Sequence, residues 1–470
     1  MRKFVIPACL AAAIAAVHPA AADVIHLKNG DTIYADRVEQ TDTRVSYDVG
    51  DNTFSIPRSK VASVETTPSA NTSVAGTLAV PTFTPETQIG GEQDLLGQVV
   101  HGTQVDRGAL GSIESQGNAH VTAIAYYLAA KAEFQAGQYQ DSRHDFETAL
   151  RFQDDNPAIL TYYAALLVRM GNALDAISYA EKATRIVPDS PDAFSVLGYA
   201  QFSANRLRDA IQSWKRSLAL RPDNTIQQLL ARAERESSAE RNYSERETGH
   251  FVLHFEGSQS SESFREQLLA TLESQYSDLA RTFGGEPRSS IQVVLYTSQA
   301  FFDVTRAPAW IGALNDGNIR IPLQGLDSVT PDLARVLRHE LTHSFVSQMT
   351  SGRCPDWLNE GIAQMLEPRS LGGREAQMAA LFKAQREIPL NMLEHGFSSL
   401  STPEARLAYD ESLGVVTFIY TKHGMTDLLR ILQQIGSGQS TEAALRSVLH
   451  DDYGSLENDY RDYLTGQYGG

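Results

Sequence analysis

A repeat with a period of 34 residues constrains the fold of this chain more than any other feature. Three copies follow one another, at residues 123–156, 157–190 and 191–224. Small residues recur where two helices must approach closely, and large ones recur where the gap between helices is filled. The equivalent positions are Gly137, Gly171 and Asn205 at the expected turn between two helices, then Ser142, Ala176 and Ala210, then Ala149, Ala183 and Ser217 about two turns further along.

This pattern resembles the tetratricopeptide repeat, in which helix pairs stack and leave a concave groove that commonly docks an extended peptide. Residues 225–240 are apolar on one side and charged on the other, so they suit a capping helix. We therefore predict a repeat domain over residues 123–240; the alternative is a generic helical bundle. The groove has two interpretations, a surface for a protein partner or a spacer between the two ends of the chain.

The segment VLRHELTHSFV, residues 336–346, has the spacing of a metal site. His339 and His343 are four residues apart and lie on one face of a helix, with Glu340 beside them. Two neutral imidazoles can bind one Zn²⁺, while the glutamate serves as general base for a water molecule at the metal. Thr330 is a natural N-cap and Pro331 a first-turn residue, which predicts where this helix begins.

A third ligand is expected on the following helix. After His343 the first helix should run about seven more residues, roughly 10 Å, before residues 351–354 turn the chain. Pro355 then opens a second helix, and Glu360 comes about one and a half turns along it. An antiparallel helix pair would bring Glu360 level with the imidazoles and complete a His₂Glu set with one open position, the catalytic pattern of zinc sites. The alternative is two ordinary helix histidines and a surface acid.

RHELTHSF followed by PDWLNEGIAQ resembles the gluzincin metallopeptidases, and most closely the bacterial peptidase MA-like domain. The resemblance extends from about His250 to about Gly424 and includes HFVLHFEG, IQVVLY, GNIRIPL and YDES. Gluzincins often place an acid four residues after the ligand glutamate to orient the first histidine. Here that position is Gln364, whose amide oxygen can accept the same hydrogen bond without a charge.

The resemblance implies a zinc-dependent peptidase. Glu340 would take the proton of the water and pass it to the leaving amine. Tyr409 is the candidate for stabilising the tetrahedral oxyanion, because YDES resembles the place where this family carries a tyrosine motif. His395 and His423 are alternative candidates for this role. A role for Tyr409 in packing alone carries the same weight as its catalytic role. GNIRIPL, residues 317–323, fits an edge strand beside the catalytic helix, where zincin peptidases pair with the substrate backbone.

The N-terminus reads as an export signal over residues 1–22. Arg2 and Lys3 precede an apolar segment that is too short for a membrane span, and small residues follow at the expected cleavage site. Cys9 raises the alternative of a lipoprotein, but its surroundings make a poor lipidation motif. The expected location is therefore outside the cytoplasm, in the periplasm, and Cys354 would be the only cysteine of the mature chain.

Charge argues against a nucleic-acid or anionic-membrane partner. Removing Arg2 and Lys3 leaves 38 of the 40 basic residues against 57 acidic ones, a net charge of −19. Beyond the signal, no apolar stretch approaches about 18 residues, so no membrane span is predicted.

Residues 23–65 alternate like about four short strands and resemble a small SH3-like β module. Residues 66–95 are expected to be a flexible linker, and residues 96–122 are ambiguous, with a possible short helix as a lead-in.

The resulting fold class is a multidomain α+β protein: a small N-terminal β module, an α-helical tetratricopeptide solenoid, and a zincin-like metallopeptidase domain over residues 247–470. Two functions compete. The first is an exported zinc endopeptidase whose repeats recruit a peptide or protein substrate or another partner. The second is a catalytically weak or inactive zincin domain in an assembly scaffold of the cell envelope. The intact HExxH and its glutamate favour the first.

Overall fold

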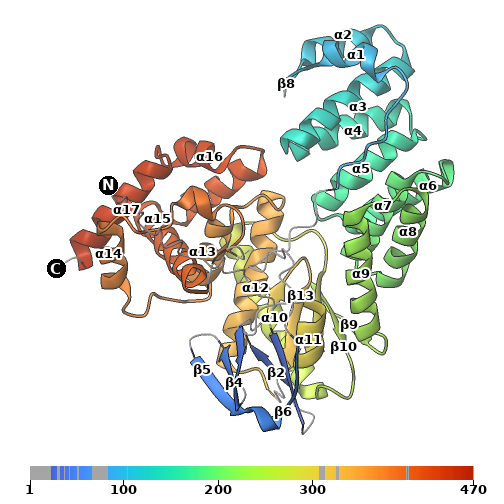
Figure 1. Ribbon diagram of the computed structural model, residues 1–470. Coiled ribbons are helices and arrows are strands. Elements are labelled where there is room, and N and C mark those ends of the chain that lie inside the picture. Colours follow the sequence, from blue (N-terminus) through green and yellow to red (C-terminus); the bar gives the residue numbers. More distant parts are fainter. Residues whose placement is uncertain are drawn as a thin grey trace, which may run out of the picture.

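The computed structural model describes residues 23–28, 32–35, 37–41, 43–49, 52–65, 83–102, 104–305, 313–323, 328–397, 400 and 402–468. The expected signal at residues 1–22 and the part of the expected linker at residues 66–82 lie outside these ranges. The described chain is mostly helical, with a small β region first, a helical repeat next and an α+β region last, which confirms the predicted fold class (Figure 1).

The N-terminal β module contains more strands than the four expected. Its two antiparallel sheets have the orders β2-β1-β6 and β3-β4-β5. Ile25, Val45 and Val61 form its buried core, so the module buries little apolar surface by itself. The strands are β1 (Asp23–Leu27), β2 (Thr32–Ala35), β3 (Arg37–Gln40), β4 (Arg44–Val49), β5 (Asn52–Pro57) and β6 (Val61–Glu65).

The region between the module and the repeats is structured from residue 83 onward. Residues 83–89 are extended, and α1 (Glu92–Val99) follows, so helix begins inside the range expected to be flexible. A two-stranded turn, β7 (Val100–His101) with β8 (Gln104–Val105), leads to α2 (Arg107–Ser115). The helical lead-in expected over residues 96–122 is thus represented by the end of α1 and by α2.

Three helix pairs and a capping helix form the repeat domain. The pairs are α3 (Ala119–Ala136) with α4 (Tyr139–Phe152), α5 (Pro157–Arg169) with α6 (Ala173–Ile186), and α7 (Pro191–Ser203) with α8 (Leu207–Leu220); α9 (Asn224–Ala239) is the cap. Gly137, Gly171 and Asn205 all have positive φ, as a tight turn between helices requires. The small residues expected at the helix contacts, from Ser142 to Ser217, are buried.

The C-terminal domain begins with a five-stranded sheet of order β12-β13-β11-β10-β9. Strands β10, β11 and β13 are parallel, while β9 and β12 are antiparallel at the two edges. Helix α10 (Glu262–Phe283) packs on α12 (Pro331–Thr350) in the same apolar core. The strands are β9 (Ser244–Glu247), β10 (Phe251–Phe255), β11 (Ile291–Thr297), β12 (Leu314–Asn315) and β13 (Ile319–Leu323), with α11 (Ser298–Thr305) between β11 and β12.

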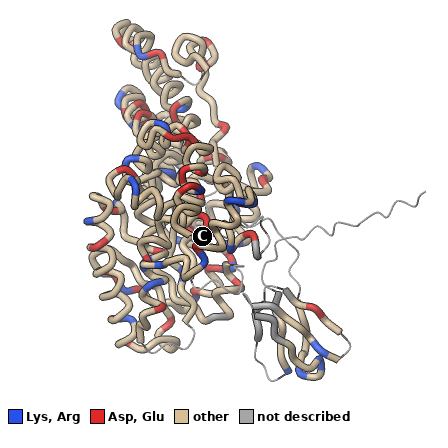
Figure 2. Tube along the Cα trace, turned by 90° about the vertical axis from the view of Figure 1, so that its left-hand side faces the viewer, with Lys and Arg blue, Asp and Glu red and all other residues tan. Residues whose placement is uncertain are grey.

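The rest of this domain is helical, as predicted. Gly424, with φ 81°, kinks α15 in its middle. Among the helices of the described residues, none combines the length and the apolar character needed to cross a membrane. Acidic and basic residues are interspersed along the helices (Figure 2). The elements are α13 (Asp356–Leu366), α14 (Glu375–Lys383), η2 (Leu390–Leu393), α15 (Thr402–Gly436), α16 (Thr441–Val448) and α17 (Tyr453–Tyr468).

The repeats contact the C-terminal domain through their inter-helix turns. The three turn residues are equivalent in the repeat, so one edge of the array faces this domain. The polar contacts are Arg353 Nη1 to Gly137 O (2.9 Å), Ser289 Oγ to Gly171 O (3.4 Å) and Asn205 Nδ2 to His254 Nε2 (3.2 Å).

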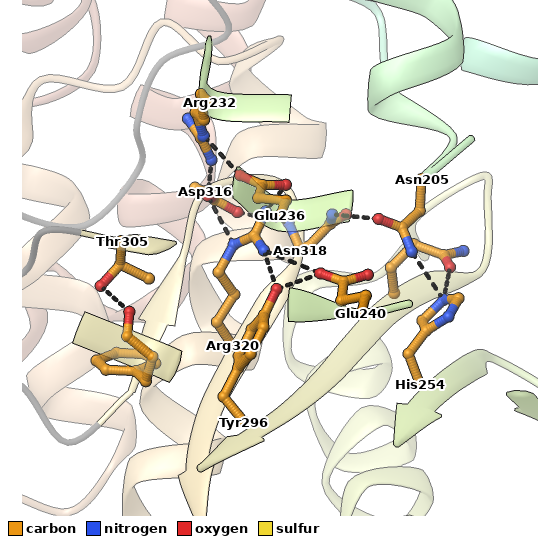
Figure 3. A network of polar contacts seen from close by, with 12 residues as sticks. Asn205, Arg232, Glu236, Glu240, His254, Tyr296, Thr305, Asp316, Asn318 and Arg320 are labelled. Atoms are coloured by element: carbon orange, nitrogen blue, oxygen red, sulfur yellow. Dashed lines mark hydrogen bonds and ion pairs between the residues drawn. The ribbon is translucent and has the colours of Figure 1, made fainter. Parts of the chain in front are cut away.

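A buried polar network joins α9 to the β12–β13 hairpin (Figure 3). The guanidinium of Arg320, on β13, is fully buried and donates to Asp316 (2.8 Å), Glu236 (3.1 Å) and Tyr296 (2.7 Å). Arg232, on α9, pairs with both Asp316 and Glu236. The repeat domain is thus fixed to the sheet by buried charge pairs as well as by its turns.

Candidate metal centre

Helix α12 carries the HExxH segment and is capped as the sequence predicts. The Thr330 side chain accepts a hydrogen bond from the Leu333 amide, Pro331 is the first helical residue and Asp332 supplies a first-turn anion. The helix ends at Thr350; its C-cap residue Ser351 has φ 52°, and Gly352, with φ 71°, continues the turn. This turn sends the chain back as α13, antiparallel to the end of α12.

A close helix contact sets the position of α13. Gly361, the residue after Glu360, lies so close to α15 that a Cβ there would meet Ser412 O at 2.4 Å. Only glycine permits this approach, so Gly361 fixes how far Glu360 lies from the rest of the site.

His339, His343 and Glu360 come together as predicted. Glu360 Oε2 lies 3.4 Å from His339 Nε2, and Glu360 Oε1 lies 3.7 Å from His343 Nε2. One ligand atom from each of the three residues falls within 4.8 Å of the others. Two imidazole nitrogens and a carboxylate converging in this way are the donor set that Zn²⁺ prefers.

The hydrogen-bonding state of these atoms fits a metal ion. His343 Nε2 and Glu360 Oε2 are buried and have no hydrogen-bond partner among the described residues. Burial lowers the pKa of His343 below its usual value, which favours the neutral ring that can offer a lone pair. Burial acts against the charge on Glu360, but the two imidazoles outweigh it and hold the pKa of Glu360 below its usual value. Unpaired buried polar atoms are costly, and a metal ion would remove this cost.

Two residues that the sequence reasoning missed lie behind the histidines. Asn359 Oδ1 is 3.0 Å from His343 Nδ1 and can fix its tautomer and ring orientation. Glu367 Oε1 is 3.7 Å from His339 Nδ1, at ion-pair distance. Glu367 follows Glu360 by seven residues, which is two helical turns on the same face, and this spacing was a signal that could have identified it.

Gln364 does not take the role expected of it. Its amide nitrogen donates to the carbonyl oxygen of Tyr409 at 2.9 Å, and its own side-chain oxygen has no hydrogen-bond partner among the described residues. The acid beside His339 is Glu367 instead. The acid expected four residues after Glu360 is therefore replaced by one seven residues after it, at the C-cap of α13.

Glu340 is buried on α12 next to His339. Burial raises the pKa of Glu340 to about 7, which suits a general base at neutral pH. Asn315, on β12, was not predicted, yet its amide nitrogen donates to the backbone carbonyl of Glu340 (2.7 Å) and to Ser344 Oγ (2.8 Å). The sheet edge thus holds the segment of α12 that carries the predicted base.

The strand expected at the edge of the sheet, residues 317–323, is instead the second strand from that edge. Strand β13 is covered on one side by β12, where Leu314 pairs with Arg320 and Asn315 pairs with Ile319. The sequence reasoning missed β12 because a two-residue strand has no detectable alternation.

Tyr409 lies on α15, with its ring 5.1 Å from that of Phe397. Burial, together with the charges of Glu360 and Glu340, raises the pKa of Tyr409 well above its usual value. Its hydroxyl therefore stays protonated and can donate a hydrogen bond. The alternatives His395 and His423 have no described contact with the three-ligand cluster, and His395 is exposed.

Burial also raises the pKa of the Cys354 thiol well above its usual value, so this cysteine stays protonated.

Fold and site together define the class of domain: an α+β domain with a His₂Glu cluster on two consecutive antiparallel helices. A comparison of the sequence with family models agrees with this class. Residues 272–466 match the Peptidase MA superfamily, and residues 127–191 and 164–225 match the tetratricopeptide repeat. The chain thus carries a Peptidase MA superfamily domain preceded by tetratricopeptide repeats, which confirms the resemblance found in the sequence.

Solved structures with some similarity contain tetratricopeptide repeats. The first such domain of Spaghetti (RPAP3), bound to the HSP90 peptide SRMEEVD, is 20% identical, with 25% of this chain and 93% of that chain covered and a TM-score of 0.24. The first such domain of human RPAP3, determined by NMR, is 21% identical, with 27% and 98% covered and a TM-score of 0.26. The search of curated proteins gives no match.

Proposed function

We propose that this protein is an exported, periplasmic zinc-dependent endopeptidase whose repeats recruit a substrate or a protein partner. The observation that carries the proposal is the convergence of His339, His343 and Glu360, in which His343 Nε2 and Glu360 Oε2 are buried and have no hydrogen-bond partner among the described residues. The match to the Peptidase MA superfamily supports hydrolysis of peptide bonds as the reaction. The export signal rests on the sequence of residues 1–22.

A zinc ion held by the three ligands would supply a Lewis acid that lowers the pKa of a water molecule and polarises the scissile carbonyl. Residues of the chain carry out the proton transfer, the stabilisation of the oxyanion and the orientation of the ligands. Glu340 accepts the proton of the water on its carboxylate and delivers it to the nitrogen of the leaving amine. Tyr409 donates a hydrogen bond from its hydroxyl to the oxyanion that forms on the scissile carbonyl. Asn359 and Glu367 orient the two imidazoles.

The substitution Glu340→Gln tests this function. We expect it to abolish hydrolysis of casein or of a peptide library and to leave the zinc content at one ion per chain, because Glu340 moves a proton and binds no metal. Turnover would be followed with a chelator control, and zinc by elemental analysis. Wild-type turnover in a zinc-loaded Glu340→Gln sample would remove Glu340 from the mechanism.

Glu360→Ala is the companion variant. It should lose zinc as well as activity, because it removes one of three ligands. Stoichiometric zinc in Glu360→Ala would exclude Glu360 as a ligand. A wild-type protein that binds zinc and hydrolyses no peptide would instead favour the scaffold function.

A further inference from the structure

The extended segment 83–89, called the strap here, lies across the first helices of the three repeats (Figure 1). The Tyr127 hydroxyl, on α3, donates to the carbonyl oxygen of Thr87 at 3.0 Å. The Tyr162 hydroxyl, on α5, donates to the carbonyl oxygen of Pro85. Both tyrosines therefore bind the main chain of the strap, a mode of recognition in which main-chain hydrogen bonds supply affinity and the positions of alternate side chains supply specificity.

A buried carboxylate on α7 continues this recognition. Asp192 accepts from the backbone amide of Glu86 at 2.7 Å and from the Thr87 hydroxyl at 2.9 Å. Arg221 pairs with Asp192 and reaches the Glu86 carboxylate at 3.0 Å. Arg221 thus places a partly exposed cation beside the position of Glu86, where an acidic side chain of the ligand can pair with it.

The exposure of the side chains alternates along the strap, as it does in a bound extended peptide. Pro85 and Ile89 are buried, Phe83 and Thr87 are half-buried, and the residues between them, 84, 86 and 88, are exposed. The Phe83 ring stacks on Tyr199, on α7, with 5.5 Å between ring centroids. Every second side chain thus enters the helical face, which is the pattern of a bound peptide with period two.

The strap leaves part of this face unsatisfied. The hydroxyl of Tyr199 is buried and has no hydrogen-bond partner among the described residues. A ligand with a carbonyl or carboxylate oxygen at this point would make a hydrogen bond that the strap does not make.

We propose that residues 83–89 are a ligand held in cis, and that the α3/α5/α7 face binds in trans an extended peptide of the same chemistry. That peptide places a side chain against the helices at every second position, with a hydroxyl at the position of Thr87 and apolar groups at the others, and it carries an acid at the position of Glu86. The tether gives the strap an effective concentration in the millimolar range, so a partner must outcompete it. This inference concerns binding and stands whether or not the protein hydrolyses peptides.

A synthetic peptide with the sequence of residues 83–90, FTPETQIG, labelled with fluorescein, tests the proposal by anisotropy on the full chain. The double variant Phe83→Ala/Glu86→Ala weakens the strap. We expect it to bind the probe at least about tenfold more tightly than wild type, because the competitor in cis is weakened. Adding Tyr162→Phe should reverse much of this gain, since it removes the donor to the main chain.

The matched control is Thr84→Ala/Gln88→Ala, which changes two exposed side chains of the same strap and should bind the probe as wild type does. A scrambled probe should bind none of the proteins. Equal affinity of the strap variant and wild type, or equal binding of the scrambled probe, would overturn the proposal.

Hydrogen exchange on the wild-type chain gives a second measurement that needs no substitution. The Glu86 amide is protected by Asp192 in the strap as seen here. Millimolar probe should raise the exchange rate of residues 83–89 while α3, α5 and α7 stay protected. Unchanged exchange of the strap at saturating probe would show that the strap is a permanent part of the repeat domain.

Discussion

His339 and His343 are each held from behind by a residue that does not reach the metal position. Glu367 lies beside His339 Nδ1, and Asn359 lies beside His343 Nδ1. Such outer partners fix ring orientation and raise the basicity of the ligand. We expect Glu367→Gln to weaken zinc affinity by about 10- to 100-fold while the fold stays intact, since the amide keeps the shape and loses the charge.

Competition with a chromophoric zinc chelator measures this affinity. Glu266→Gln, which makes the same change at an exposed site on α10, should leave zinc affinity unchanged. If Glu367→Gln held zinc as tightly as the Glu266 variant, the 3.7 Å contact with His339 would be incidental.

The ligands could be predicted from sequence because helix geometry alone relates them. His339 and His343 are one turn apart, and Glu360 follows at a matching distance along the return helix. Asn315 could not be predicted in this way, because its contact with Glu340 depends on how the sheet edge packs against α12. Contacts between segments distant in the chain have no local spacing rule.

The α3–α4 pair contains two buried carboxylates that share one arginine. Arg107 pairs with Glu133 and, at 2.6 Å, with Asp145. Burial, and then the charge of Asp145, raise the pKa of Glu133 to about 8. A carboxyl whose folded pKa lies above its ordinary value of about 4.5 stabilises the fold when protonated. That stability is lost as the pH rises from about 4.5 through about 8.

We therefore expect the repeats of the wild-type chain to unfold at a lower temperature at pH 8 than at pH 5. Glu133→Gln should remove much of this difference and raise stability at pH 8 by about 1–3 kcal/mol, because a buried and incompletely paired charge is gone. Calorimetry from pH 5 to pH 8 would measure it. Asp155→Asn, at an exposed position, should follow the wild-type curve.

Regular elements could be predicted better than irregular ones. The turns at Gly137, Gly171 and Asn205 followed from the repeat, and the structure gives all three a positive φ. The strap at residues 83–89 could not be predicted, because a segment without charge patterning or helical period resembles a linker until the surface that binds it is known. Strand β12 was missed for a similar reason.

The repeats and the Peptidase MA domain share a buried network and therefore form a coupled unit. Arg232 and Glu236 of α9 meet Asp316 and Arg320 of the hairpin, and the residue beside Asp316 is Asn315, which bonds to the Glu340 carbonyl. A continuous set of contacts thus runs from the last repeat helix to the predicted base. Loss of the network should affect both the docking of the repeats and the position of Glu340.

Arg320→Ala tests this coupling. It leaves the carboxylates of Glu236 and Asp316 buried with Arg232 as their remaining cation, and breaking a buried pair in this way costs about 3–5 kcal/mol. We expect a single calorimetric transition to split into two and peptide turnover to fall with it. Arg335→Ala removes an arginine that is half exposed and pairs only with the exposed Asp332 among the described residues, so it should change stability by less than about 0.5 kcal/mol. If Arg320→Ala kept one transition at the wild-type temperature, the network would contribute no net stability. The turns at Gly137, Gly171 and Asn205 would then be sufficient to hold the repeats against the domain.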